Sequence, residues 1–539
     1  MSRLDLLLVS QSNVVDHEAY ADLPLDRLDL YESLVYPRMV HHEGRFRGHL
    51  DFLNRREFGK YYGEATFPER RRMLNIWNLP SMSGTHLANY LQQFGIRLRV
   101  INNVDSEWDW FCDAYDESSE PPLVALSTTF YLSWKEIGRV TKLLRSHDPD
   151  MDIVLGGAFV NSQVPADGNA SALEKPMRKY GIRYAVHSFN SEPDLRDLVL
   201  ARKSGGDFSR VRNLCRIDGK LATGSFDAGT SQWHDPLLAE IPATWDRVEM
   251  PFLNKTIQIR TASGCPFSCA FCSYPTTARG WKTVEADSVR AHLDALTRIP
   301  GLEKVIFIDD TFNVPPHRFE ELLRIFCEYD FEWFSFLRVQ YTDESVIRLM
   351  KESGCRGVYL GIESASDRIL ANMNKKARRK QFAEGVELLN KHGIEYLAAF
   401  VLGFPGEDES TIRENVDFIN RHGVKYYSLK EFFYIENTLV HEQRDAYGLT
   451  GMGAKWSHAT MDHEQAARIK LEIFDEIESS VLVDADTSLW HLAYLYDQGW
   501  SFDRIRHAQT GINDLMKRQL RQRPRTVELP AAPGLEAGV

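Results

Sequence analysis

The first two hundred residues alternate between short apolar runs and stretches with helical periodicity. Leu6–Val9 is apolar at every position and is typical of a strand buried on both faces. The other predicted elements of this region are strands at Arg97–Ile101, Leu123–Ser127 and Asp152–Leu155 and helices at Ser83–Gly95 and Ile137–Leu144. Strands separated by helices of this length predict a doubly wound parallel sheet, which is a Rossmann-like α/β fold.

A polar, aromatic-rich stretch of roughly residues 12–80 separates the first strand from the first clear helix. It is too long for a simple loop, so we expect it to carry helices of its own. The sequence therefore predicts an N-terminal domain over residues 1–205 that contains this insertion. A linker over residues 206–250 is expected to follow it.

A second and more regular alternation begins near Thr256. Its predicted strands are Thr256–Thr261, Lys304–Asp309, Glu332–Val339, Gly357–Glu363, Glu395–Leu402 and Val424–Phe433. Six successive βα units predict an open sheet or a partial barrel over residues 251–440, because a closed barrel needs eight. Residues 441–525 are predicted to form a small helical region, and residues 526–539 a disordered tail.

The composition is that of a soluble protein with several domains. The chain has 539 residues, of which 43% are hydrophobic and 26% are charged. Its formal net charge of −12 disfavours nucleic-acid binding through phosphate contacts. No apolar run is long enough to span a membrane, and the N-terminus lacks the pattern of a signal peptide. Seven cysteines are too sparse for a disulfide framework, so a reducing, cytoplasmic location is expected.

Three of the cysteines lie within eight residues, in a loop directly after the first strand of the second alternation. These are Cys265, Cys269 and Cys272. A structural zinc ion needs four ligands, and no fourth Cys or paired His lies at zinc spacing. Three thiolates instead suit a [4Fe-4S] cluster with one iron open to another ligand. The alternative, three unrelated buried cysteines, does not explain such close spacing.

The Cys-x3-Cys-x2-Cys pattern resembles that of the radical S-adenosylmethionine (SAM) superfamily, and the resemblance covers about Thr256–Phe433. It implies a partial (βα)6 barrel, with SAM bound to the open iron. It also implies SAM contacts from residues that follow successive strands: Phe271, Asp309, Asp310, Gly361, Glu363, Ser364 and Gly403. Arg338 is a candidate for the methionyl carboxylate, or else part of an ordinary ion pair.

The α/β domain ahead of this core resembles the cobalamin-binding domains of the same superfamily. Ser127, Thr128 and Thr129 close one strand, and Gly156 and Gly157 close the next. The resemblance implies that these residues surround the nucleotide tail of cobalamin, although hydroxyl groups also occur as plain caps at strand ends.

The Asp-x-His-x-x-Gly motif that supplies a lower cobalt ligand in many cobalamin domains is missing, so binding without a His ligand is expected. Arg70, Arg71 and Arg72 are candidates for covering the lower face of the cofactor. The alternative, a solvated helix face, is favoured for this arginine triplet.

These features together resemble cobalamin-dependent radical SAM methyltransferases of natural-product pathways. The resemblance implies methyl transfer from SAM via methylcobalamin to an unactivated carbon or a phosphinate phosphorus of a small-molecule or natural-product precursor. One alternative keeps both cofactors but catalyses a rearrangement, cyclisation or oxidation. Another is a non-catalytic cobalamin or redox sensor. A methylthiotransferase is excluded, because only Cys112 and Cys215 precede the core.

The expected partners are a small-molecule substrate and an external electron donor such as flavodoxin or ferredoxin. No nucleic acid or membrane is expected to bind, and the chain is expected to be a monomer. Trp456 and His458 lie in a glycine-containing stretch, residues 451–461, after the last barrel strand. This stretch is typical of a lid that contacts substrate, or of a surface loop in which Trp456 anchors the C-terminal helices.

Overall fold

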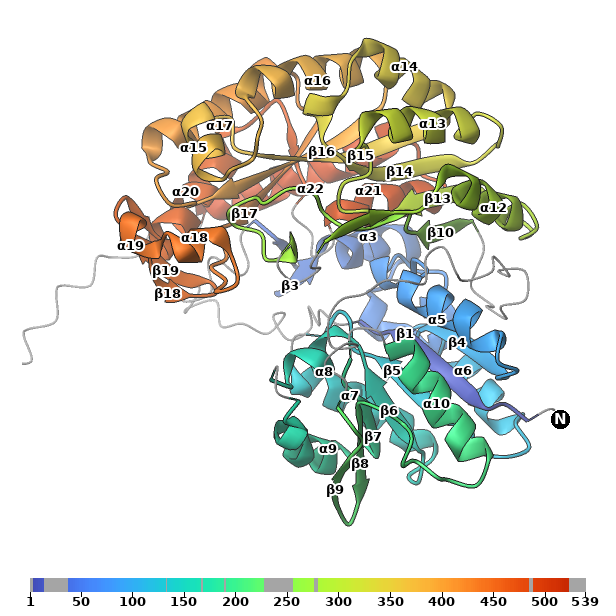
Figure 1. Cartoon of the computed structure of the whole chain (residues 1–539). Coiled ribbons are helices and arrows are strands. Elements are labelled where there is room, and N and C mark those ends of the chain that lie inside the picture. The colour runs from blue at the N-terminus through green and yellow to red at the C-terminus, as the bar shows by residue number, and fades with distance from the viewer. Residues whose placement is uncertain are drawn as a thin grey trace, which may run out of the picture.

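A computed structural model describes residues 3–13, 37–131, 133–165, 168–188, 191–226, 255–275, 280–483 and 488–522. Two α/β units are stacked on one another, with the N-terminal unit below the barrel in the view of Figure 1. None of the helices in the described part of the chain is long and apolar enough to cross a membrane.

The N-terminal unit is the predicted doubly wound sheet. Its parallel strands are β1 (Leu6–Gln11), β4 (Leu98–Asn103), β5 (Leu123–Ser127), β6 (Ile153–Gly156) and β7 (Tyr184–Val186), in the order β4-β1-β5-β6-β7. On one face, Leu6 and Leu8 belong to a core with α5 (Met82–Gln92) and α10 (Ser191–Lys203). On the other, Leu7 and Val9 belong to a core with α6 (Trp108–Asp116) and α7 (Trp134–His147). Burial on both faces explains why the first strand is uniformly apolar.

This sheet continues into the segment predicted to be a linker. The strands β8 (Leu214–Asp218) and β9 (Lys220–Thr223) form a hairpin, and β8 pairs antiparallel with β7. The prediction of a linker over residues 206–250 is therefore wrong in its first part. The hairpin lies at a sheet edge and is mostly exposed, so it lacks the apolar pattern that marks the inner strands.

The predicted insertion contains helices, as expected, and also a hairpin. Its elements are β2 (Met39–His42), β3 (Arg45–Gly48), α3 (His49–Phe58) and α4 (Phe67–Arg70). Met39, Val40 and Phe46 are buried in the same core as the barrel. The insertion thus packs against the barrel and lies between the two units (Figure 1).

All six predicted barrel strands are present. They are β10 (Thr256–Ile259), β13 (Lys304–Phe307), β14 (Glu332–Leu337), β15 (Cys355–Glu363), β16 (Glu395–Leu402) and β17 (Tyr426–Glu431), parallel and in sequence order. A short seventh strand, β21 (Val481–Leu482), extends the sheet beyond β17. The outer layer contains α12 (Ala286–Leu296), α13 (Pro316–Phe326), α14 (Glu344–Glu352), α16 (Arg379–His392) and α17 (Glu409–Arg421) (Figure 1). The row of strands does not close, which confirms a partial barrel.

The C-terminal region is only partly helical. It contains α20 (His463–Glu476), α21 (Ser488–Asp497) and α22 (Phe502–Gln522). Before them, β18 (Thr450–Met452), β19 (Lys455–His458) and β20 (Met461–Asp462) form a small antiparallel sheet, which the prediction of a helical region with a lid or loop did not include. Their brevity and glycines concealed them in the sequence. The predicted tail, residues 526–539, lies outside the described residues.

Candidate functional site

The cysteine loop follows β11 (Ala262–Gly264), which continues from β10 and pairs with β12 (Trp281–Thr283). Cys265, Cys269 and Cys272 are free, partly exposed thiols. Gly264 has φ of 79°, and a side chain there would overlap the backbone of Gly280, so only glycine fits at the start of the loop.

The three thiols are close enough to influence one another. The pKa of Cys272 is raised to about 11, mainly by burial and further by the neighbouring Cys269 and Cys265. Among the described residues, no three His, Cys, Asp or Glu side chains are gathered as they would be around one metal ion. In a [4Fe-4S] cluster each thiolate binds a different iron, so wider sulfur spacing is needed.

The two acids after β13 have different roles. Asp309 is buried, and its carboxylate accepts hydrogen bonds from the backbone N–H groups of Thr261 (2.6 Å) and Ala262 (2.9 Å) and from the Thr261 hydroxyl. It fixes the turn that leads into the cysteine loop, so the structure does not support its predicted contact with SAM. Asp310 is exposed beside Tyr274 and Arg260 and remains available for a ligand.

Arg338 packs against Phe267 of the cysteine loop. Its guanidinium carbon lies 3.6 Å from the centre of the Phe267 ring, and Phe267 also stacks on Tyr341. The guanidinium donates to the backbone carbonyl of Lys375. Among the described residues Arg338 forms no ion pair, and its contact with the methionyl carboxylate stays a prediction. It makes a cation–π contact that positions the residue between the first two cysteines.

The predicted ribose motif ends β15 in a strained turn. Glu363 has φ of 65°, and its carboxylate lies 2.8 Å from the ammonium group of Lys375. Gly361 lies under this ion pair, where a Cβ would come 2.5 Å from the Glu363 carboxylate. Such strain in a residue other than glycine is typical of functional sites. Ser364 is fully buried and accepts from the N–H of Ser366, so it shapes the turn.

Gly403 and Trp456 are packed together. Gly403 has φ of 81°, and a Cβ there would overlap the Trp456 indole. Trp456 is 2% exposed and donates its indole N–H to the carbonyl of Phe432 at 2.6 Å. His458 stacks on it and lies 3.1 Å from the Gly403 carbonyl. This burial in β19 favours a scaffold over the predicted lid with substrate-contacting residues. Phe271 is half-buried against Phe404, near the same rim.

A cavity of about 250 Å³ opens between the N-terminal sheet and the helices α5 and α10. Ser127, Thr129, Gly156 and Gly157 line it, as predicted. Gly157 has φ of 110°, and a Cβ there would lie 3.0–3.2 Å from atoms of Thr128 and Thr129. The cradle therefore depends on a missing side chain. It fits the slender nucleotide tail of a corrinoid.

One of the other predictions for this domain needs correction, whereas the favoured interpretation of the arginine triplet agrees with the structure. Thr128 is buried and does not line the cavity; its hydroxyl donates to the Gly156 carbonyl at 2.8 Å and ties the two strand ends together. Arg71 pairs with Asp109 at 2.7 Å and lies over the Trp110 ring, which favours an ordinary surface contact. Arg70 donates to the Ala65 carbonyl, and Arg72 is exposed.

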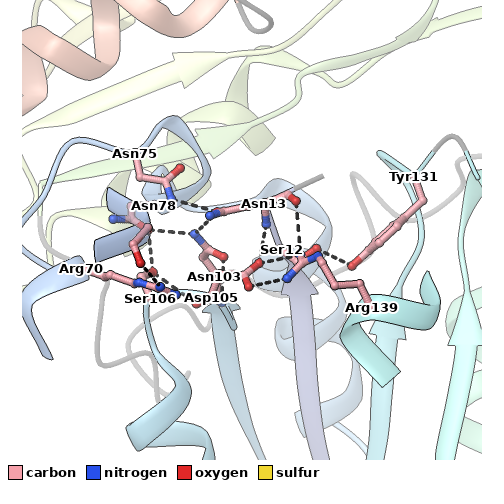
Figure 2. Close-up of polar contacts among 11 residues, drawn as sticks. Ser12, Asn13, Arg70, Asn75, Asn78, Asn103, Asp105, Ser106, Tyr131 and Arg139 are labelled. Carbon is pink, nitrogen blue, oxygen red and sulfur yellow. Dashed lines mark hydrogen bonds and ion pairs between the residues drawn. The ribbon is translucent and has the colours of Figure 1, made fainter. Parts of the chain in front are cut away.

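Asn13, shortly after β1, belongs to a polar network at the carboxyl ends of β1 and β4 (Figure 2). Asn13 accepts from Asn75 (2.8 Å) and Asn103 (3.1 Å), and its backbone N–H donates to Asp105. Asp105 is held by Arg139 through two bonds of 2.6 and 2.8 Å.

Each unit also buries one glutamate at a strand end. Glu107 accepts from the N–H of Asn102 at 2.8 Å, and Glu407 accepts from the N–H of Gly403 at 2.5 Å. Burial raises the pKa of both carboxyls to about 8. The second oxygen of Glu407 has no hydrogen-bond partner among the described residues.

Sequence reasoning missed several residues at these sites. Arg260, from the end of the first barrel strand, lines the cavity of the N-terminal unit. His86 and Glu192, 3.8 Å apart, come from different helices and line the same cavity. These residues are far apart in the sequence and meet only in the folded protein, so no sequence motif connects them. Lys375 had a weak signal in a basic run that follows the ribose motif.

Comparison with known proteins agrees with this arrangement. Residues 259–419 match the Radical SAM superfamily model. An uncharacterized methyltransferase of Pyrococcus horikoshii is 36% identical over 29% of this chain and 34% of its own length. The bacteriochlorophyllide d C-12(1)-methyltransferase of Chlorobaculum tepidum is 32% identical over 30% and 36%. The matched segment thus spans about a third of these curated relatives.

A solved structure resembles the chain over nearly its whole length. The radical SAM methyltransferase TsrM of Kitasatospora setae, with cobalamin and a [4Fe-4S] cluster bound, aligns over 97% of this chain and 99% of its own. The TM-score is 0.56 and the sequence identity 15%. This likeness confirms the predicted fold class of a Rossmann-like unit followed by a partial barrel.

Proposed function

We propose that this protein is a cobalamin-dependent radical SAM methyltransferase, because residues 259–419 match the Radical SAM superfamily model. Its substrate would be a small molecule or natural-product precursor, methylated at an unactivated carbon or a phosphinate phosphorus. When bound, the cluster with SAM would supply radical chemistry and the corrinoid would carry the methyl group.

The observation that carries this proposal is the position of Arg260. It lines the cavity in the N-terminal sheet, and its charge partly offsets the effect of burial, which raises the pKa of Asp310 on the barrel rim. One guanidinium is therefore close to both candidate cofactor sites. This proximity supports a reaction in which two cofactors and one substrate must meet.

The chain's own residues would bind and orient the cofactors. Cys265, Cys269 and Cys272 would hold the cluster, and the exposed Asp310 carboxylate would accept hydrogen bonds from the SAM ammonium group. Glu363, held by Lys375, would face the ribose hydroxyls. Ser127, Thr129, Gly156 and Gly157 would hold the corrinoid tail and thereby keep the ring over the interface between the units.

Anaerobic purification followed by assays of iron, sulfide and corrinoid tests the cofactor content. Turnover with SAM labelled in its methyl group then tests the reaction. We expect about four irons and one corrinoid per chain, and label in the product. Stoichiometric zinc without iron or sulfide would overturn the proposal.

The same experiment separates the alternatives. A product formed without the label would indicate a rearrangement, cyclisation or oxidation. A chain that binds both cofactors but turns over no candidate substrate, and changes shape on reduction, would indicate a sensor. Electron paramagnetic resonance of the cobalt(II) form tests the lower face: nitrogen splitting from an axial base would contradict binding without a His ligand.

A further inference from the structure

Directly outside the cysteine loop lies a concentrated run of basic residues. The segment from Lys375 to Lys380 reads Lys-Lys-Ala-Arg-Arg-Lys, in a chain whose net charge is −12. It connects α15 (Asp367–Asn372) to α16. Such a run on an acidic protein creates a locally positive electrostatic potential.

This segment is hydrogen-bonded to the cysteine loop. The side chain of Asn374 donates to the carbonyl of Ser268 at 2.7 Å, and Ser268 precedes Cys269. The N–H of Ala270, on the other side of Cys269, donates to the carbonyl of Met373 at 2.8 Å. The basic segment is therefore the immediate neighbour of the middle cysteine.

The backbone divides the basic run into an inner and an outer part. Asn374 and Lys376 have φ of 51° and 56°, so the chain bends sharply on both sides of Lys375. Lys375 points inward, where it is 7% exposed and paired with Glu363. Lys376, Arg378 and Lys380 are exposed on the outside.

Two of these outer cations form no ion pair within the described part of the chain. Ion pairs involve Arg379 with Glu414 and Lys380 with Glu384, at 3.6 Å each, but none is formed by Lys376 or Arg378. Pro266 and Ser268 are also exposed, so the outer turn of the cysteine loop reaches the same surface. A positive rim thus borders the loop that carries the three candidate cluster cysteines.

We propose that the surface formed by Lys376, Arg378 and Lys380, with the outer turn of the cysteine loop, docks an acidic one-electron carrier protein. The inference rests on the proposed function, because the cluster is the acceptor. The reduced carrier loses one electron and the cluster gains it; no bond forms or breaks, and no proton is required. Charge complementarity speeds encounter and fixes the orientation of such partners.

Stopped-flow reduction of the reconstituted full-length enzyme tests this surface, with reduced flavodoxin as the carrier. In the double variant Lys376→Glu/Arg378→Glu, we expect an about tenfold slower reduction of the cluster at low salt, and a flatter dependence of the rate on salt. Reduction by dithionite should be unchanged, because that small reductant needs no docking surface. Iron content and dithionite reduction also verify that the variant is folded and loaded.

A matched control is Arg324→Glu/Arg348→Glu, on the outer helices α13 and α14. These arginine side chains are 71% and 65% exposed, and their reversal changes the net charge equally. This control should retain wild-type rates with flavodoxin. If both double variants are slowed equally, or if neither is slowed, the proposed docking surface is wrong. Binding of an oligonucleotide to this surface, while flavodoxin reduces every variant equally fast, would also overturn it. Failure of dithionite to reduce the wild-type enzyme would instead remove the cluster, and the proposed function with it.

Discussion

The cavity of the N-terminal sheet and the rim of the barrel both lie at the carboxyl ends of parallel strands, but they are lined differently. At the rim, several charged groups already have partners within the protein. Glu363 pairs with Lys375, Asp309 accepts hydrogen bonds from the Thr261 turn, and Arg338 lies over the Phe267 ring. In the cavity, the essential feature is space, provided by Gly156 and Gly157 beside small hydroxyl residues.

This difference follows from the ligands that the two sites would take. A cluster and the zwitterionic end of SAM need groups held at fixed positions, and prior pairing supplies that order. A long corrinoid tail needs a slot between sheet and helix, so the slot depends on side chains that are absent. Substitutions should therefore act in opposite ways: removal of atoms should damage the rim, and addition of atoms should damage the cavity.

The largest expected effect comes from the rim. Cys269→Ala should lose the cluster and lower turnover to background, because the two remaining thiolates would bind only two of its four irons. Bound corrinoid should stay near the wild-type amount, since the cavity lies in the other unit. Iron and corrinoid assays on the same sample measure both. Cys327→Ala, at an exposed cysteine after α13, is the control and should keep full iron. Iron retained in Cys269→Ala would contradict the assignment.

The complementary change adds atoms to the cavity. Gly157→Leu should weaken corrinoid binding about tenfold or more, corresponding to about 1.4 kcal/mol, because the side chain would meet Thr128 and Thr129. Iron content should be unchanged. Corrinoid titration followed by absorbance measures the affinity.

Backbone strain alone must be separated from this steric effect. Gly205 has φ of 106°, close to the 110° of Gly157, but has no atoms within 4 Å of its would-be Cβ. Gly205→Leu therefore introduces similar strain in open space. It should lower stability without lowering corrinoid affinity. Equal loss of affinity in both variants would show that the cavity is not the binding slot.

The two regions also differ in how far the sequence could predict them. The cysteine triplet carries its chemistry in its spacing, and the six barrel strands are regular enough to read directly. The glycine pair was recognisable only through resemblance, because absent side chains leave little signal. The roles of Asp309 and Arg338 could not be read from their positions after strands. Whether such a residue faces a ligand or a neighbouring loop depends on contacts between distant segments, as between Arg338 and Phe267.

A smaller effect should appear in the pH dependence of stability. Burial raises the folded-state pKa of Glu407 to about 8, above the ordinary value of 4.5. The folded protein thus holds this proton more tightly than the unfolded chain, so the free energy of unfolding falls as pH rises from 4.5 to about 8. The slope for one group is about 1.4 kcal/mol per pH unit. Glu107 should behave alike in the other unit.

Urea unfolding of Glu407→Gln at pH 6, 7 and 8 measures this contribution. The variant should lose stability less steeply with rising pH than the wild type, because its amide cannot ionise. Glu107→Gln applies the same test to the N-terminal unit, and the comparison tells whether the two units unfold together. A slope in both variants equal to that of the wild type would show that neither carboxyl holds a proton near neutral pH.

The smallest expected effect concerns the small sheet in the stretch that was interpreted as either a lid or a surface loop. Trp456→Phe removes the indole N–H that donates to the Phe432 carbonyl but keeps an aromatic ring beside Gly403. The loss of one buried hydrogen bond should lower the free energy of unfolding by about 1 kcal/mol. Because Trp456 is 2% exposed, it has little surface to offer a substrate, so the Michaelis constants for SAM and substrate should stay within about twofold. Chemical unfolding and steady-state kinetics on one preparation separate the two effects. If the Michaelis constant for the substrate rises while stability is unchanged, the result would instead support the lid hypothesis. Residues of β19 would then contact the substrate next to the barrel rim.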